Sequence, residues 1–218
     1  MPRLFAPGCA LVLHKPALAA RLHEFFSADG EEVAVLDTCC RNHPELPPGA
    51  EVINVCPGCD RRYRELYDGR ISTVSAWELL ACSRTFPFPD YQGVEMTVHD
   101  ACPTRNQPRV HEAVRALLRR MNVTVVEPAW ARTKAVCCGD SFVGLASDHK
   151  VRAQMLRRAA AMPRQQVVVY CVSCVKAMHI GGRTPRHLVD LLFGEDSPVG
   201  TFEPGAWHAQ LDEHIAAH

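Results

Sequence analysis

The stretch Val167-Val168-Val169-Tyr170-Cys171-Val172-Ser173-Cys174 contains the pattern on which the fold prediction depends, a short apolar strand followed at once by cysteine. Four consecutive residues that favour β-structure are typical of a buried strand. The pattern recurs in predicted strands at residues 4–6 before Cys9, 33–36 before Cys39, 52–55 before Cys56, 94–98 before Cys102 and 135–136 before Cys137. Residues 123–126 form a further predicted strand.

Helical patterns separate these strands. They are predicted at residues 16–27, 74–81, 109–121, 146–162 and 185–193. Strands that alternate with helices indicate an α/β fold with a parallel sheet. Because the order of strands and cysteines in the first half recurs in the second, we predict two tandem, pseudo-symmetric, Rossmann-like parallel-sheet halves with cysteines at the carboxyl ends of the strands.

Two prolines and a glycine interrupt the periodic pattern between residues 83 and 93. We therefore expect a first cysteine-rich half at residues 1–92, a second at residues 93–194 and a C-terminal tail at residues 195–218. The spacing of Trp207, Leu211 and Ile215 is typical of a short amphipathic helix in the tail. We expect it to be a packing helix or a frayed end, with a docking role as the alternative.

The chain has 218 residues, with 24 Lys plus Arg, 24 Asp plus Glu and no formal net charge. This balance gives no electrostatic reason to expect nucleic acid or an anionic membrane as a partner, and no apolar run is long enough for a membrane span. No glycine-rich fingerprint follows a predicted strand, so we expect no bound NAD, flavin or ATP. Pro7 and Gly8 interrupt the apolar start, which argues against a secretory signal and favours a cytoplasmic protein with free thiols.

The eleven cysteines are the unusual feature of the composition. Each half supplies one isolated cysteine, two adjacent cysteines and a Cys-x-x-Cys pair. The first-half quintet is Cys9, Cys39, Cys40, Cys56 and Cys59, and the second-half quintet is Cys102, Cys137, Cys138, Cys171 and Cys174. Cys82 is left over, and we predict a buried structural thiol there because it ends a helical pattern that includes Trp77 and Leu80.

Ligand sites of parallel α/β sheets form beyond the carboxyl ends of the strands, so we expect each quintet to converge. A tetrahedral zinc ion or a cubane cluster takes four protein ligands, which leaves one thiol of each quintet unused. Adjacent cysteines in an extended segment point to opposite faces, which suits two iron atoms better than one metal ion. The quintets therefore favour a polynuclear iron–sulfur centre, and zinc remains an alternative.

A family resemblance is carried by Val98-His99-Asp100-Ala101-Cys102-Pro103, by Cys137-Cys138-Gly139 and by Cys171-Val172-Ser173-Cys174. Together these segments resemble the cysteine-rich Cys-Cys-Gly domain in the disulfide-reducing subunit of heterodisulfide reductase. Similar domains occur in iron–sulfur subunits of glycolate oxidase, anaerobic glycerol-3-phosphate dehydrogenase and lactate utilisation systems. The first half resembles the domain through Pro7-Gly8-Cys9, Cys39-Cys40 and the Cys56 pair. The resemblance implies that all five cysteines of a quintet hold a non-cubane [4Fe-4S] cluster, and that a small disulfide is reduced between two such clusters.

The first half departs from the family pattern in two ways. Arg41 stands where the second half has Gly139, and 15 residues separate Cys40 from Cys56 where 32 separate Cys138 from Cys171. We expect a helix to be missing there, so the first-half quintet holds a cluster, zinc or nothing, and the chain holds one or two clusters.

His99 is the candidate catalytic residue. Its imidazole could donate a proton to a departing thiolate or a hydrogen bond to a cluster sulfur, or it only caps the strand end. Four arginines lie near the thiols in the sequence. They would compensate the negative charge of a cluster or bind an anionic substrate, and the alternative is that they are solvated surface residues. They are Arg61, Arg62, Arg105 and Arg109.

The predicted function is that of an iron–sulfur oxidoreductase subunit. It would take electrons from an iron–sulfur or flavin partner subunit and pass them to a small disulfide, whose reduction needs two electrons. Two alternatives remain open. One is an electron-transfer subunit of a dehydrogenase complex without its own substrate, and the other is a zinc-stabilised binding module without redox chemistry.

Overall fold

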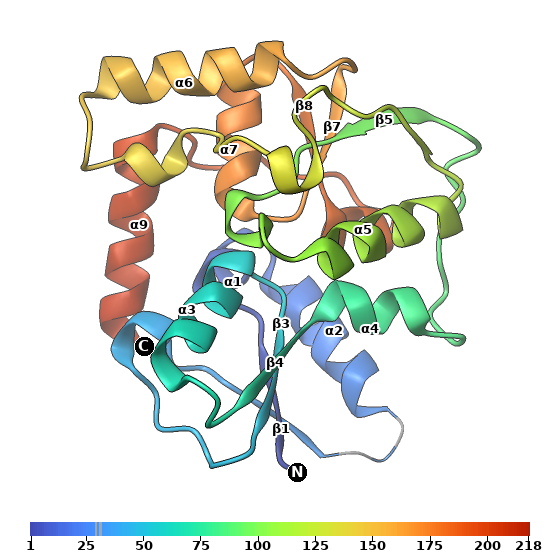
Figure 1. Cartoon of the computed structure of the whole chain (residues 1–218), viewed down its shortest axis with the longest axis vertical. Helices are drawn as coiled ribbons and strands as arrows, with labels where there is room; N and C mark the ends of the chain where they lie inside the picture. The colour runs from blue at the N-terminus through green and yellow to red at the C-terminus, as the bar shows by residue number, and fades with distance from the viewer. Residues whose placement is uncertain (29, 31) are drawn as a thin grey trace. The chain divides into compact units, whose positions relative to one another are not determined.

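The computed structural model describes residues 1–28, 30 and 32–218, and the chain divides into two compact units (Figure 1). The first unit comprises Met1–Phe86 and Leu211–His218, and the second comprises Pro87–Gln210. Each unit has its own parallel sheet, which confirms the predicted α/β fold with two halves of the same plan. In the described part of the chain, no helix is both long and apolar enough to cross a membrane.

The first unit contains a four-stranded parallel sheet with the strand order β2-β1-β3-β4. Its strands are β1 (Arg3–Ala6), β2 (Val33–Val35), β3 (Glu51–Asn54) and β4 (Ser72–Ser75). Its helices are α1 (Cys9–His14), α2 (Pro16–Ser27), α3 (Pro57–Tyr67) and α4 (Ala76–Cys82), with a 3-10 turn η1 (Cys40–Asn42). Central residues such as Val52 and Ile53 of β3 are fully buried.

The second unit repeats this order as β6-β5-β7-β8. Its strands are β5 (Glu95–Val98), β6 (Thr124–Val125), β7 (Gln166–Val169) and β8 (Thr184–His187). Its helices are α5 (Pro108–Arg120), α6 (Asp148–Ala160), α7 (Val172–Ile180) and α8 (Leu188–Leu192), with 3-10 turns η2 (Cys102–Thr104), η3 (Arg132–Lys134) and η4 (Asp140–Phe142). The last helix, α9 (Pro204–Ala217), confirms the helix expected in the tail.

The strand order explains why sites form at equivalent places in the two units. In each sheet, successive crossovers run in opposite directions from the first strand, β1 or β5. Open parallel sheets bind ligands at this switch point, beyond the carboxyl ends of the two central strands. Cys9 follows β1 and Cys56 follows β3, while Cys102 follows β5 and Cys171 follows β7.

The sequence prediction was wrong for some short elements. Strands β4 and β8 were missed because each offers few apolar residues, and β8 also contains Pro185. Both are edge strands, where a missing N–H is tolerated. The helices predicted at residues 74–81 and 185–193 therefore begin later, at α4 and α8, and residues 135–136 are not a strand but follow the turn η3.

The prediction of a buried Cys82 was also wrong, because its thiol is exposed. The buried face of α4 consists of Ala76, Trp77 and Leu80. At 100° per residue, position 82 lies about 140° around the helix from Trp77, on the other side. The apolar pattern of the helix therefore does not extend to its last residue.

Candidate metal centre

The first-half quintet meets beyond the carboxyl ends of β1, β2 and β3. The Sγ atoms of Cys9 and Cys39 lie 3.8 Å apart, and those of Cys40 and Cys59 lie 3.5 Å apart. Side-chain contacts between Cys39 and Cys40, and between Cys56 and Cys59, join these pairs. The five sulfur atoms therefore form one continuous chain in the order Cys9, Cys39, Cys40, Cys59, Cys56.

The second-half quintet shows the same chain of contacts. Cys102 contacts Cys137, which contacts Cys138, and Cys174 contacts Cys171. The Sγ atoms of Cys138 and Cys174 lie 3.5 Å apart, the distance found for Cys40 and Cys59. Each half thus connects its isolated cysteine, its adjacent pair and its Cys-x-x-Cys pair in the same order.

The sulfur atoms form an extended set and not a compact tetrahedron. Thiolates around one zinc ion, with bonds of about 2.3 Å, would all lie about 3.8 Å from one another. In the part of the chain that the structure describes, the groups of three or more possible ligands within 4.8 Å of one another include no three thiols of one quintet. The clustered thiols suggest metal or iron–sulfur binding, and the extension of each quintet fits a polynuclear centre better than a single ion.

The packing of the thiols separates their pKa values. The pKa of Cys39 falls to about 2 because its sulfur accepts hydrogen bonds from Cys40 and Cys9. The same contact with Cys39 raises the pKa of Cys9 and raises that of Cys40 to about 12. In the second half, the contact between Cys102 and Cys137 lowers the pKa of Cys137 and raises that of Cys102. Without metal, one thiolate suppresses ionisation of its neighbours, and a bound cationic centre would be needed to ionise the whole set.

Two glycines shape the backbone around the thiols. Gly8 has a φ of +82°, and a Cβ added to it would lie 2.8 Å from the Cβ of Cys56. Gly139 has a φ of +118°, and its Cβ would meet the side chain of Met155 at 2.9 Å. Arg41 is the first-half counterpart of Gly139. It lies in the right-handed turn η1, where glycine is not needed, and the left-handed residue of this loop is His43, with a φ of 51°.

The end of α9 packs in the core cluster of the first-half thiols, as α6 does in that of the second-half thiols. In the second half, Val151 and Met155 of α6 pack against Cys137 and Cys138. The first half has no helix among residues 43–50, as predicted from its shorter interval. Instead, Leu211 and Ile215 of α9 pack in the same core cluster as the first-half thiols. The amide of Asn42 donates to the carbonyl of Ile215 at 2.9 Å.

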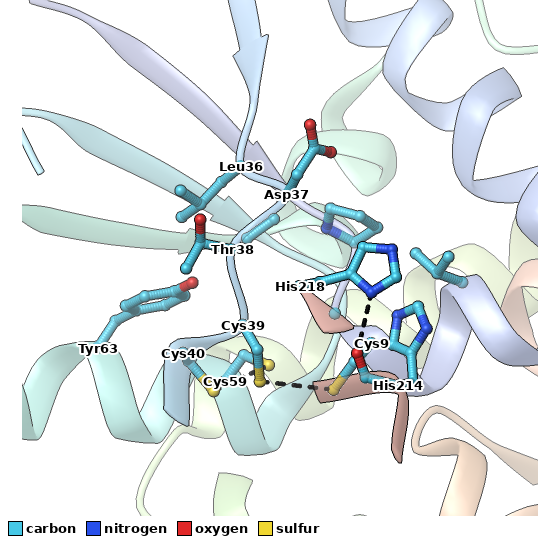
Figure 2. A pocket seen from close by; sticks show the side chains of 14 residues that line it. Cys9, Leu36, Asp37, Thr38, Cys39, Cys40, Cys59, Tyr63, His214 and His218 are labelled. Atoms are coloured by element: carbon cyan, nitrogen blue, oxygen red, sulfur yellow. Dashed lines mark hydrogen bonds between the residues drawn. The ribbon is translucent and has the colours of Figure 1, made fainter. Parts of the chain in front are cut away.

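The first-half thiols border a cavity of about 370 Å³. Figure 2 shows the thiols of Cys39, Cys40 and Cys59 with Tyr63 on one side and the imidazoles of His214 and His218 on the other. Cys9, Asp37 and Thr38 also line it. Polar and ionisable groups of the chain therefore face a space that a small molecule can enter, next to sulfur.

His99 and Asp100 lie in the interior of the second unit. The His99 side chain is fully buried, and its Nδ1 accepts a hydrogen bond from Arg158 Nε at 3.0 Å. Burial and the charge of Arg158 lower the pKa of His99 to about 3, so the ring is neutral. Asp100 accepts from Arg115 at 2.8 Å, from the backbone of Arg132 at 2.6 Å and from Tyr170 at 3.1 Å. These bonds fix the segment that leads to Cys102.

Two of the four arginines considered from the sequence hold the backbone beside the thiols. Arg62 Nε donates to the carbonyl of Cys40 at 2.9 Å, and Arg105 Nη2 donates to that of Ala135 at 3.0 Å. Arg61 pairs with Glu65 on the surface of α3.

Sequence reasoning missed three groups close to the thiols. His214 and His218 have a signal in their spacing of four residues on the expected tail helix, which places both on one face. Arg158 has no local signal, because only the packing of α6 brings it to His99, 59 residues earlier.

A comparison with known proteins gives a match in the second half of the chain. Residues 96–179 match a family model described as a cysteine-rich domain, CCG. The matched segment contains the whole second-half quintet and none of the first. No curated protein matches the chain.

Proposed function

Residues 96–179 belong to the Cys-Cys-Gly cysteine-rich domain family, and from this premise we propose that the chain is a heterodisulfide-reductase-like iron–sulfur oxidoreductase subunit. The observation that carries the proposal is the identical order of sulfur contacts in the two quintets. A partner iron–sulfur or flavin subunit would supply electrons in a reducing cytoplasm, where the thiols stay free. The electron acceptor would be a small disulfide.

Each quintet would hold one non-cubane [4Fe-4S] cluster through its five thiolates. When bound, such clusters supply one-electron redox equivalents, and two of them match the two electrons that a disulfide needs. Zinc would use only four of the five thiols in either half. The extended sulfur arrangement supports the cluster over zinc in both halves.

The cavity in the first unit borders Cys9, Cys39, Cys40 and Cys59, so an enzyme would bind its disulfide in the part of this space that a cluster leaves open. Its volume of about 370 Å³ is in the range of small-molecule sites, which is roughly 300–1,000 Å³. A disulfide that enters it would lie beside Cys9 and Cys39. Its reduction by two electrons from the partner subunit releases thiolates that take up protons, and His214 and His218, which line the same cavity, would donate them.

The test is anaerobic reconstitution followed by reduction of small disulfides with a reduced viologen dye as electron donor. We expect turnover in the wild type and a loss in Cys9→Ser, with the iron content reported for both. Full cluster loading without turnover of any disulfide would leave the carrier as the better account. Zinc without iron or labile sulfide would reject both redox proposals.

A further inference from the structure

We propose that His99 tunes the second-half centre by donating a hydrogen bond from Nε2 to a sulfur atom of that centre, and that the first-half centre lacks this donor. The inference rests on the proposed function, because it concerns how one of two clusters is tuned. It makes the two centres of the pseudo-symmetric chain chemically different.

The position of His99 carries the first step. A ring nitrogen of His99 and the Sγ atoms of Cys138 and Cys174 all lie within 4.8 Å of one another. The side chain is fully buried, and its Nε2 has no hydrogen-bond partner among the described residues. A buried polar group without a hydrogen-bond partner is energetically unfavourable. An acceptor supplied at the neighbouring sulfur atoms would remove this cost.

Arg158 decides what His99 can do there. A guanidinium group has donors and no acceptor, so the bond from Arg158 Nε makes His99 Nδ1 an acceptor. In the neutral ring the proton is then on Nε2. A metal-ligating histidine normally donates its other N–H to an acceptor, and His99 does the opposite. The side chain is therefore set up as a hydrogen-bond donor and not as a ligand.

Like the hydrogen bond from His99, the charge of Arg158 stabilises the reduced state of the centre. Its side chain is buried, and its Nη1 also lacks a partner among the described residues. Its charge acts on Cys138 and Cys174. A buried positive charge and a hydrogen bond to sulfur both stabilise the more negative, reduced state of a cluster. Together they raise the midpoint potential of the second-half centre.

The first half has no equivalent donor at this position. His99 lies three residues before Cys102, and the residue three before Cys9 is Ala6, at the end of β1. The methyl group of Ala6 offers no N–H. The two quintets thus share their sulfur contacts and differ in this neighbour.

The test compares His99→Phe with His99→Gln in anaerobically loaded protein, by redox titration followed by electron paramagnetic resonance. Phe keeps the ring volume and removes the donor, while Gln keeps an N–H near the Nε2 position. We expect both variants to retain their iron and sulfide. The potential of one centre should fall in His99→Phe, recover in His99→Gln and stay unchanged in His149→Phe, a control at an exposed position of α6.

Two results would overturn the inference. The first is an unchanged midpoint potential in fully loaded His99→Phe, which would show that His99 does not tune the centre. The second is loss of iron in both variants together with strong coupling to an imidazole nitrogen in the wild type, which would show that His99 is a ligand. If the Phe variant does not fold, ¹⁵N NMR of the metal-free wild type decides, since the neutral Nε2–H form is expected and the Nδ1–H form contradicts it. Wild type that binds no iron would reject the proposed function itself. The metal content therefore distinguishes this failure from a failure of the inference about His99.

Discussion

At the scale of single residues, a buried ion network holds the segment before Cys102. Arg115 is 2% exposed and donates to Asp100, which is fully buried, and to Glu127. Charges buried in this way are stable only while each keeps its partner. The network therefore positions the thiol of Cys102 by fixing the backbone two residues away.

Replacement of Arg115 by Met should destabilise the protein strongly. It leaves the Asp100 carboxylate buried without its cation, which costs about 3–5 kcal/mol. The free energy of unfolding from urea titration of the metal-free protein measures this loss. Arg164→Met is the control, because the Arg164–Glu95 pair is exposed and should contribute less than about 1 kcal/mol. Equal effects of the two substitutions would show that the buried network has no special role.

Gly8→Ala should impair the first-half centre specifically. The substitution brings a Cβ to 2.8 Å from that of Cys56 and forces a side chain into a left-handed conformation. Gly69→Ala is a matched control, with a φ of +76° and no atom within 4 Å of the added Cβ. Both should lose about 1–2 kcal/mol of stability from backbone strain. Only Gly8→Ala should also lose bound iron, and retention of iron equal to that of Gly69→Ala would contradict the role given to this close approach.

The residues of the candidate site were predictable only in part. The ten thiols repeat with a spacing that strands and helices explain, so sequence alone grouped them into two quintets. The environment of His99 was not predictable, because Arg158 reaches it through tertiary packing. Asp100 gave no sign of its partner Arg115, which lies on α5.

At the scale of elements, helix α9 completes the first unit with its last turns. Ile215 is 8% exposed and packs in the cluster that contains Cys39 and Cys40. Arg41 also pairs with Asp212 at 2.6 Å. The last turns of the chain thus pack against the first-half thiols, whereas α6 packs against the second-half thiols in the second unit.

Ile215→Ala should therefore weaken the first-half centre. Loss of most of a buried isoleucine side chain costs about 2–4 kcal/mol. We expect a lower free energy of unfolding together with a reduced iron content. Glu213→Ala, at an exposed position of the same helix, should change neither. An iron content equal to that of the wild type in Ile215→Ala would mean that α9 does not support the site.

The elements also show where sequence patterns stop being informative. Long amphipathic helices such as α2 and α5 follow their apolar spacing closely. The edge strands β4 and β8 pair along one side only and need few apolar residues, so their sequences resemble loops. The missing helix of the first half was predictable from an interval, but its replacement by α9 depends on contacts more than 150 residues apart in the chain.

At the scale of the whole molecule, two units of one plan each carry five thiols at the switch point of a parallel sheet. The repeat extends from strand order to the order of sulfur contacts. It does not extend to the surroundings, because the first-half thiols border a cavity and the second-half thiols lie beside His99 and Arg158. We expect two centres of one type with different potentials.

The most direct test is the iron, labile sulfide and zinc content of anaerobically purified wild type, Cys40→Ser and Cys138→Ser. We predict iron and sulfide in near-equal amounts in the wild type and a loss of about half of both in each single variant. A variant that carries both substitutions should contain neither iron nor sulfide. Zinc in place of iron, or single variants that keep the full iron content, would contradict this prediction.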